Sequence, residues 1–428
     1  MSDAAAAGPA IEHVLAYGQS LSTGWDGWPV LSRSARPGCL MLGSSVRGVD
    51  EAAPRWAPLG RLAFLPLFAI AQDIRTGALL ADEAPPAAEI LGETVLESAL
   101  AYCAARRGRG SAALLGSACG VGGRPLEKLS RGAAPELFNR LRDCVRLARL
   151  VARAERRAYR VAAVLLLQGE SNVAGDGTRD RGEYAALLHR LIDDILGDIA
   201  AGQDAPPAIL LYQTSGAYTH DDMDVPQAQL DLALARPGVF LAGPTYPYPE
   251  KHGHMDGNGY RWLGAQFGKV LHRALNGDAA WRPLHPTRAT LSGQTVRIAF
   301  SVPTPPLAWE TPFVGLQRRE IADRGFTVLD AAGPVPIADA SLEDAATVAL
   351  RLARPPAAGP LHVRYADRTR HHGRGMLHDS EPTMAEDAFV SDFAGAPYSP
   401  ADAAALGGRP YALVNWCTAF AMAVERTR

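Results

Sequence analysis

The chain has 428 residues, a length that favours two domains over one compact unit. Hydrophobic residues make up 47% and charged residues 21%, as in an ordinary soluble globular protein, and the formal net charge is -2. This balance gives no indication of nucleic acid or an acidic membrane surface as a partner.

The first residues, 1–11, lack the basic flank and the apolar core of a signal peptide. The apolar stretch 62–70 is interrupted by Pro66 and is too short to cross a bilayer. The five cysteines are far apart without a C-x-x-C pair, which argues against a disulfide framework or a zinc ribbon. We therefore expect a cytoplasmic protein with free thiols.

Apolar runs alternate with helical patterns through the first two thirds of the chain. The apolar runs, typical of central parallel strands, are 13–17, 112–115, 161–167, 209–212 and 239–242. The helical patterns are 94–107, 135–157, 184–199 and 259–275. This alternation predicts an α/β doubly wound domain over 10–277. A stretch rich in Pro, Gly and Trp, 25–91, interrupts it and is predicted to be an irregular insertion over the top of the sheet.

Beyond residue 277 the pattern changes to short strands separated by Gly and Pro turns. The predicted strands are 290–302, 326–329, 347–352, 361–365 and 411–420. They predict a second, smaller, mostly β and sandwich-like domain over 280–428. Its polar, glycine-rich loop 371–380 could pack against the first domain near a site or form an exposed hairpin.

Four polar motifs follow the predicted strands, where the reactive groups of a parallel sheet gather. They are Gly18-Gln19-Ser20, Gly122-Gly123, the segment 168–172 and the pair His252 and His254. Together they can supply the nucleophile, the general base and the oxyanion donors that ester hydrolysis requires. His252, His254 and Asp256 also have a pattern that can bind zinc, so a metal-dependent hydrolase is an alternative.

In this order the motifs resemble the blocks of the SGNH (GDSL-like) hydrolases. The motifs Gly-Gln-Ser at 18–20 and Gln-Gly-Glu-Ser-Asn at 168–172 are similar to those of the carbohydrate acetylesterase branch, which includes sialate O-acetylesterases. The resemblance covers about residues 12–275. It implies a three-layer, flavodoxin-like parallel sheet and no cofactor.

The resemblance also implies roles for single residues. Ser20 would attack the ester carbonyl and His254 would accept its proton. The implied oxyanion hole consists of the backbone N–H groups of Ser20 and Gly123 and the Asn172 side chain. Gln168 and Glu170 would support it.

Two features modify this reading. The family usually has Asp three residues before the catalytic histidine, where this chain has Lys251. We expect Glu250 to replace it, or a Ser–His dyad to operate without a carboxylate. The aromatic residues near the motifs, expected to stack on sugar rings, are Trp25, Trp28, Tyr246 and Tyr248. The leading hypothesis is therefore hydrolysis of O-acyl, above all O-acetyl, esters of a carbohydrate or polyol; a catalytically silent carbohydrate-binding protein is a further alternative.

Overall fold

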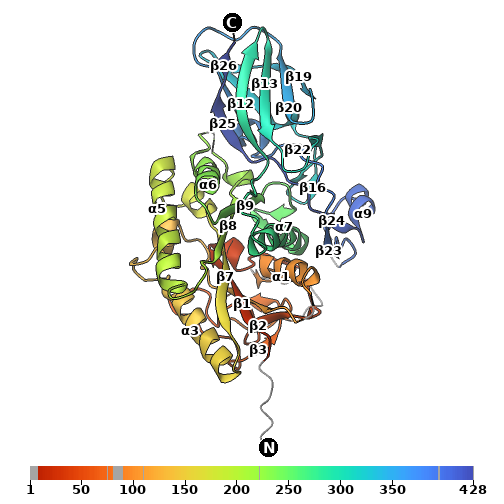
Figure 1. Cartoon of the computed structure of the whole chain (residues 1–428). Helices are drawn as coiled ribbons and strands as arrows, with labels where there is room; N and C mark the ends of the chain where they lie inside the picture. The colour runs from red at the N-terminus through yellow and green to blue at the C-terminus, as the bar shows by residue number, and fades with distance from the viewer. Residues whose placement is uncertain are drawn as a thin grey trace, which may run out of the picture.

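The computed structural model describes residues 8–74, 76–80, 90–108, 110–220, 222–393 and 396–427. Figure 1 shows an α/β part that holds the N-terminal residues, and a β-rich part that rises from it and holds the C-terminus. Among the described residues, no helix combines the length and the apolar character needed to cross a membrane.

The α/β part is built on a parallel sheet, as predicted. Its five main strands are β1 (Ile11–Gly18), β6 (Ala113–Ala118), β7 (Tyr159–Leu167), β8 (Ala208–Gln213) and β9 (Val239–Pro244). They lie in the order β6-β1-β7-β8-β9, and all neighbours are parallel. This is the flavodoxin-like order, in which ligands bind beyond the carboxyl ends of the strands where the order reverses, here between β1 and β7.

Two further strands extend the sheet beyond β6 and correct the sequence prediction. Strand β2 (Cys39–Leu42) is parallel to β6, and β3 (Phe64–Pro66) is antiparallel to β2. Both come from the stretch 25–91, which we predicted to be irregular throughout. Strands of three or four residues are too short to give a periodic signal. Residues 81–89 of this stretch lie outside the described residues.

Helices cover both faces of the sheet (Figure 1). One face carries α1 (Val95–Ala105) and α7 (Gly257–Leu275); the other carries α3 (Asn139–Ala154), α5 (Arg181–Asp194) and α6 (Asp224–Ala235). Successive residues of β1 face opposite cores: Val14 packs with α1 and α7, whereas Leu15 packs with the other three helices. Helix α6 was not among the predicted helices; it contains Pro226 in its first turn, where proline is tolerated.

The C-terminal region, residues 280–427, contains two main sheets around a third core. One sheet has the order β19-β20-β13-β12-β26 and the other β18-β17-β21-β25. Their bounds are β12 (His285–Ser292), β13 (Thr295–Ser301), β17 (Phe326–Asp330), β18 (Gly333–Val335), β19 (Ile337–Leu342), β20 (Thr347–Leu352), β21 (His362–Tyr365), β25 (Phe420–Ala423) and β26 (Glu425–Arg426). The predicted strand 290–302 is thus a hairpin of two strands that turns at Gly293.

The short elements complete the chain. They are β4 (Gln72–Asp73), β5 (Ile90–Leu91), α2 (Leu126–Leu129), α4 (Glu170–Ala174), β10 (Glu250–Lys251), β11 (His254–Met255), β14 (Ala308–Trp309), β15 (Phe313–Val314), β16 (Gln317–Arg318), α8 (Arg368–His371), β22 (Leu377–His378), β23 (Met384–Ala388), α9 (Pro400–Leu406) and β24 (Pro410–Ala412). The segment from β23 to β24 folds back onto α1 and α7, where Phe389 and Tyr411 pack against Trp262.

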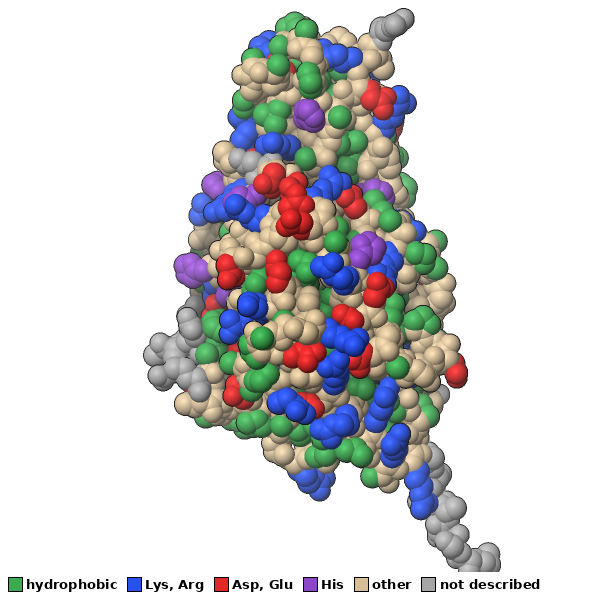
Figure 2. Space-filling view, turned by 90° about the vertical axis from the view of Figure 1, so that its left-hand side faces the viewer, with side chains coloured by type: hydrophobic (Ala, Val, Ile, Leu, Met, Phe, Trp, Pro, Cys, Tyr) green, Lys and Arg blue, Asp and Glu red, His purple; other side chains and the backbone are tan. Residues whose placement is uncertain are grey.

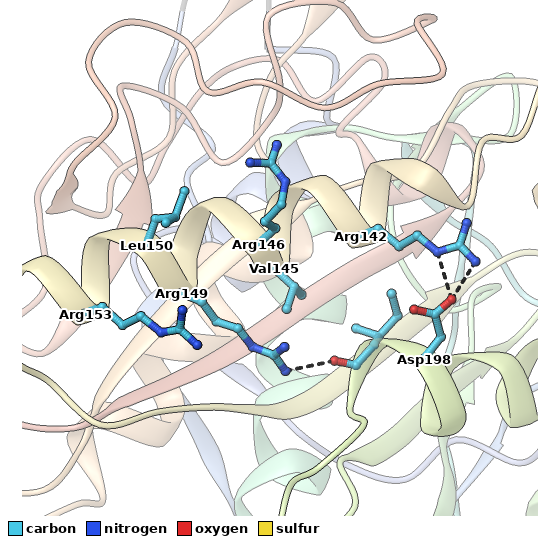
Figure 3. Close-up of a pocket in the computed structure, with 8 residues that line it drawn as sticks. Arg142, Val145, Arg146, Arg149, Leu150, Arg153 and Asp198 are labelled. Carbon is cyan, nitrogen blue, oxygen red and sulfur yellow. Dashed lines mark hydrogen bonds and ion pairs between the residues drawn. The ribbon is translucent and has the colours of Figure 1, made fainter.

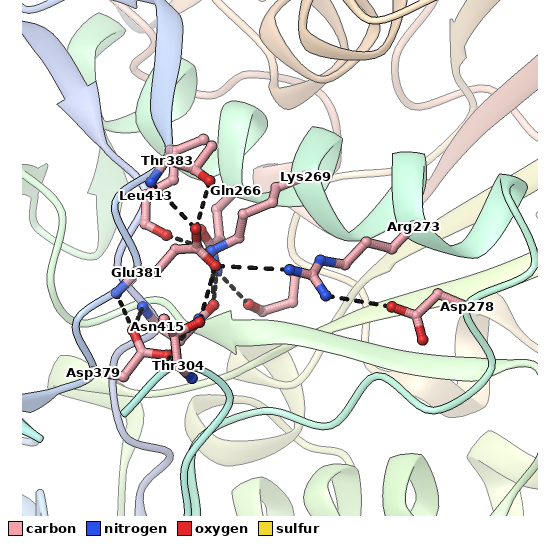
Figure 4. A network of polar contacts seen from close by, with 11 residues as sticks. Gln266, Lys269, Arg273, Asp278, Thr304, Asp379, Glu381, Thr383, Leu413 and Asn415 are labelled. Atoms are coloured by element: carbon pink, nitrogen blue, oxygen red, sulfur yellow. Dashed lines mark hydrogen bonds and ion pairs between the residues drawn. The ribbon is translucent and has the colours of Figure 1, made fainter. Parts of the chain in front are cut away.

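A buried polar network joins α7 to the C-terminal region (Figure 4). The Lys269 ammonium donates to Asn415 Oδ1 at 2.7 Å and to the Leu413 carbonyl. Asn415 in turn donates from its backbone and its side chain to the Asp379 carboxylate, at 2.8 and 2.7 Å. Burial lowers the pKa of Lys269 to about 7. Each group in this network depends on its neighbour, because an unpaired polar group is costly to bury.

Asn415→Ala is therefore expected to destabilise the whole chain. It would remove partners from both Lys269 and Asp379, at a cost of about 2–4 kcal/mol in the free energy of unfolding. Urea unfolding of the variant and the wild type measures the difference. Asn276→Ala, which alters only an exposed side chain at the end of α7, is the control and should change stability little. Equal stability of wild type and Asn415→Ala would contradict the prediction.

Candidate functional site

Ser20 and His254, which are 234 positions apart in the chain, meet beyond the carboxyl end of β1. Ser20 opens a 3-10 helix, Ser20–Ser22, directly after the strand and Gln19. Its Oγ lies 2.8 Å from His254 Nε2. Gly18 makes this turn possible: its φ is +147°, and a Cβ there would lie 2.0 Å from the Leu167 carbonyl oxygen of β7. The structure thus brings together the two residues predicted to be nucleophile and base.

A tight hairpin presents His254. Its strands are β10 and β11, and the two residues between them, His252 and Gly253, both have positive φ, at 51° and 92°. Positive φ at both positions defines a type I′ turn, the connection that best fits the twist of a two-residue hairpin. The hairpin thereby sets the position of the His254 ring at the end of the sheet.

The carboxylate next to His254 belongs to Asp26, not to Glu250. Asp26 Oδ2 lies 3.2 Å from His254 Nδ1, the ring nitrogen that faces away from Ser20. The Glu250 carboxylate is occupied elsewhere, by Arg374 at 2.8 Å and by the N–H of Gly253 at 2.5 Å. This corrects the expectation that Glu250 orients the histidine. The sequence contained no signal for Asp26, because it reaches His254 from the loop after Ser20.

Arg47, a buried arginine, connects the loop that carries Asp26 to the rest of the stretch before α1. Arg47 donates to the carbonyl oxygens of Thr23 at 3.2 Å, Gly92 at 2.7 Å and Ile70 at 2.7 Å, and to Gln72 Oε1 at 2.8 Å. Burial lowers the pKa of Arg47 to about 10, so the guanidinium is still charged at neutral pH. It holds segments far apart in the sequence around the turn that carries Ser20 and Asp26.

An open cavity of about 380 Å³ lies over the pair. Its lining residues are Gln19, Ser20, Trp25, Gly122, Gly123, Glu170, Ser171, Ala174, Gly175, Tyr218, Gly253 and His254. The Trp25 and His254 rings are 5.6 Å apart at 32°, so Trp25 forms one wall beside the histidine. Tyr218 was not predicted to lie at the site, and it lines the cavity as a second aromatic ring.

Two residues that line this cavity, Ser20 and Gly123, have backbone N–H groups without a hydrogen-bond partner among the described residues. Ser20 is the first residue of a 3-10 helix, and its N–H has no partner within that helix. Gly123, with φ of +66°, lies in the turn after β6, and within the described residues its N–H makes no hydrogen bond. The neighbouring Gly122 N–H donates to Glu51 Oε1 at 2.6 Å. The predicted donors Ser20 and Gly123 therefore both line the cavity.

Asn172 does not line the cavity, contrary to expectation. It is fully buried, and its Oδ1 accepts the N–H of Leu126 at 2.8 Å and the Gln168 amide at 2.6 Å. Its Nδ2 donates to Glu127 at 3.1 Å and to the Thr178 carbonyl at 3.0 Å. All its polar atoms are thus engaged in joining the loop after β6 to the loop after β7. Gln168 is buried in the same network.

Asn172→Ala is consequently expected to act on stability and loop order. Leaving several buried donors and acceptors unpaired should cost about 2–4 kcal/mol in the free energy of unfolding. Denaturant unfolding of the variant beside wild type tests this. A variant with wild-type stability would show that these hydrogen bonds contribute little.

Glu170 and Gln19 are two buried polar residues that line the cavity. Glu170 is almost completely buried, accepts a hydrogen bond from Tyr212 and has a second oxygen without a partner among the described residues. Burial raises the pKa of the Glu170 carboxyl above its usual value. Gln19 Oε1 accepts the N–H of Ser171 at 2.8 Å. Glu170, predicted to support the oxyanion hole, thus lies in the cavity lining, and Gln19 is a neighbour that was not predicted.

Three of the aromatic residues expected at the site lie in the core. The Tyr246 hydroxyl donates to the Cys417 carbonyl at 2.8 Å, and its ring packs on Trp416 in the C-terminal region. Trp28 and Tyr248 are buried in two other hydrophobic clusters. Burial makes Tyr246, Trp28 and Tyr248 unavailable to a sugar in the cavity, so of the four only Trp25 remains a candidate contact.

The residues of the zinc alternative do not converge. Asp256 caps α7 by accepting the N–H of Gly259 at 2.8 Å, and its other oxygen accepts the Tyr398 hydroxyl. His254 faces Ser20 and Asp26 instead. Among the described residues, no group of three or more His, Cys, Asp or Glu side chains has an arrangement suited to a metal ion.

A second cavity, of about 280 Å³, lies on the outer side of α3 (Figure 3). It is lined by Arg142, Val145, Arg146, Arg149, Leu150, Arg153, Asp198 and Ile199. Arg142 pairs with Asp198 at 2.5 Å, and Arg149 donates to the Ile199 carbonyl at 3.3 Å. On the face seen in Figure 2, acidic side chains lie among the basic ones. The described residues that line this cavity include no Ser, Thr, Cys or His, so the cavity over Ser20 is the better candidate.

Comparisons with family models and with curated proteins gave no match. A carbohydrate acetylesterase from Xanthomonas citri superposes with a TM-score of 0.53 and 15% identity, over 86% of this chain and 77% of that one. A protein from Arabidopsis thaliana gives 0.42 and 18%, over 61% and 98%. The carbohydrate acetylesterase Est24 from Sinorhizobium meliloti gives 0.30 and 13%, over 63% and 99%. The chain has the fold of an SGNH-type hydrolase, with a mostly β region after it.

Proposed function

We propose that this protein is a carboxylic ester hydrolase with Ser20 as its nucleophile. The observation that carries the proposal is the chain of contacts from Ser20 Oγ to His254 Nε2, at 2.8 Å, and from His254 Nδ1 to Asp26, at 3.2 Å. It has the order of nucleophile, general base and orienting carboxylate that defines a serine hydrolase triad.

In this mechanism Ser20 Oγ attacks the ester carbonyl carbon while His254 Nε2 takes the hydroxyl proton. Collapse of the tetrahedral intermediate breaks the ester C–O bond, and His254 returns the proton to the leaving alcohol. Water, activated by the same histidine, then attacks the acyl-Ser20 ester and releases the acid. Asp26 holds the ring with its proton on Nδ1 and stabilises the imidazolium that forms in each step.

The oxyanion donors in this proposal are the backbone N–H groups of Ser20 and Gly123. Gln19 takes the place that we expected for Asn172, because no other Asn or Gln is found among the described residues that line the cavity. Its Oε1 is already held by Ser171, which leaves its NH₂ group as the available donor. Losing one such donor typically lowers turnover by about 10²–10³-fold.

The proposed substrate is an O-acetyl ester of a carbohydrate or polyol. Trp25 and Tyr218 provide two aromatic surfaces suited to a sugar ring. No Lys or Arg side chain is found among the described residues that line the cavity, which favours an uncharged ligand. The fold shared with a carbohydrate acetylesterase is consistent with this substrate class.

A fluorophosphonate probe followed by peptide mass spectrometry tests the nucleophile. Labelling should fall on the peptide that contains Ser20 and be lost in Ser20→Ala. Ser22→Ala is the matched control and should still be labelled, because the Ser22 hydroxyl donates to the Gln19 carbonyl at 2.6 Å. Hydrolysis of acetylated sugars, compared with longer p-nitrophenyl esters, then tests the substrate class. Glycan binding without turnover of any ester would instead identify a binding protein.

A further inference from the structure

One loop of the C-terminal region, residues 371–376, reaches the hairpin that presents His254. The Gly373 carbonyl accepts the N–H of Gly216 at 3.1 Å. The Arg374 side chain is only 4% exposed and donates to the carbonyl oxygens of Phe313 at 2.8 Å and His372 at 2.6 Å. Of the two arrangements that the sequence left open for this loop, the structure has the packed one.

Arg374 connects this loop to the hairpin through Glu250. The guanidinium Nη2 lies 2.8 Å from Glu250 Oε1, and Glu250 Oε2 accepts the N–H of Gly253 at 2.5 Å. The backbone N–H of Glu250 donates to the Gly315 carbonyl at 3.0 Å, a second contact with the C-terminal region. Gly253, the residue immediately before His254, is therefore held by the Glu250 carboxylate, and Arg374 in turn holds that carboxylate.

The same hairpin packs tightly on the other aromatic wall of the cavity. A Cβ at position 253 would lie 2.3 Å from the Tyr218 ring, so only glycine fits there. The Tyr218 loop begins at Gly216, which the C-terminal loop also contacts. The C-terminal region consequently touches both loops that form this side of the cavity.

We propose that Arg374 is a positioning residue for the reaction: through Glu250 it fixes the hairpin that presents His254 to Ser20, so the C-terminal region completes the site. This inference rests on the proposed esterase function. Arg374 and Glu250 touch no reacting atom in this scheme. Their effect comes from geometry, since a displacement of about 1 Å can lower a rate by about 10²-fold.

The experiment compares Arg374→Gln, Glu250→Gln and the double variant with a matched control, Arg261→Gln. Arg261 is also buried, and it also joins the two parts of the chain, through Asp387 at 2.5 Å, but among the described residues it makes no hydrogen bond or ion pair with the hairpin 250–255. We expect kcat for an acetyl ester to fall by about 10–100-fold in each single variant at position 374 or 250, with KM changed by less than about threefold. The double variant should lose no more than the worse single one, because both changes break the same link.

Hydrogen–deuterium exchange of peptides covering residues 248–256 gives a readout that does not need turnover. Exchange there should rise in Arg374→Gln and Glu250→Gln and stay at the wild-type level in Arg261→Gln. If Arg374→Gln fails to fold, Glu250→Gln, which keeps the shape of the side chain, gives the same two readouts. Wild-type kcat and exchange in a folded variant would overturn the inference, whereas a wild-type protein that hydrolyses no ester would overturn the proposed function alone.

Discussion

Ser20→Ala is expected to lower kcat/KM for an acetyl ester by about 10⁴-fold or more, to a residual rate supported only by binding and the oxyanion donors. His254→Ala should cause a loss of similar size, because Ser20 has no other base within hydrogen-bonding distance among the described residues. The reason is that a serine hydroxyl is a weak nucleophile until a base removes its proton.

The informative measurement is the double variant. Residues that act as one unit give non-additive losses, so Ser20→Ala/His254→Ala should be about as slow as either single variant. Thermal unfolding of the three variants checks that each is folded. If the fold-losses of kcat/KM in the two single variants multiplied in the double variant, Ser20 and His254 would not act in the same step. Full activity of Ser20→Ala would remove Ser20 from the mechanism.

Asp26→Asn is expected to reduce kcat by about 10²-fold with little change in KM. An asparagine NH₂ facing Nδ1 favours the tautomer that carries its proton on Nε2, and that nitrogen can then no longer accept the Ser20 proton. The loss should be smaller than the roughly 10⁴-fold found where the carboxylate is fully buried, because the Asp26 side chain is 31% exposed and water can partly replace it.

Steady-state kinetics of Asp26→Asn and of Asp73→Asn test this expectation. Asp73 lies in the same stretch before α1 but does not line the cavity, so the same substitution there should leave kcat near the wild-type value. Wild-type turnover in Asp26→Asn would instead support a Ser–His dyad.

The parallel sheet and the meeting of Ser20 with His254 could be predicted, because the local sequence patterns agree with the topology of the whole domain. Each main strand contains an apolar run, and the parallel topology brings the carboxyl ends of these strands together. Ser20 and His254 were therefore predicted from opposite ends of the domain. Gly123 and Glu170 were proposed in the same way, from the segments that follow β6 and β7, and both line the cavity.

Other assignments failed because they depend on contacts between distant segments. Asn172 has the chemistry of an oxyanion donor, but Leu126 and Glu127 take its hydrogen bonds, and nothing in its own neighbourhood reveals this. Tyr246 is close to the motif in sequence, yet its hydroxyl is bound by the C-terminal region. Asp26 was overlooked for the opposite reason: it lies among tryptophans and glycines without any pattern of its own.

The position of Asp26 changes how a missing motif residue should be judged. The proposed triad needs a carboxylate beside Nδ1 of the histidine, and a loop from another part of the chain can place it there. Here the loop after Ser20 places Asp26 beside His254, and position 251 is a lysine that donates to the Trp28 carbonyl at 3.1 Å. The absence of an aspartate three residues before the histidine is therefore not in itself evidence that a related protein is inactive. In the proposed triad, the seven residues 20–26 therefore carry both the nucleophile and its carboxylate, and Arg47 holds that stretch through the Thr23 carbonyl.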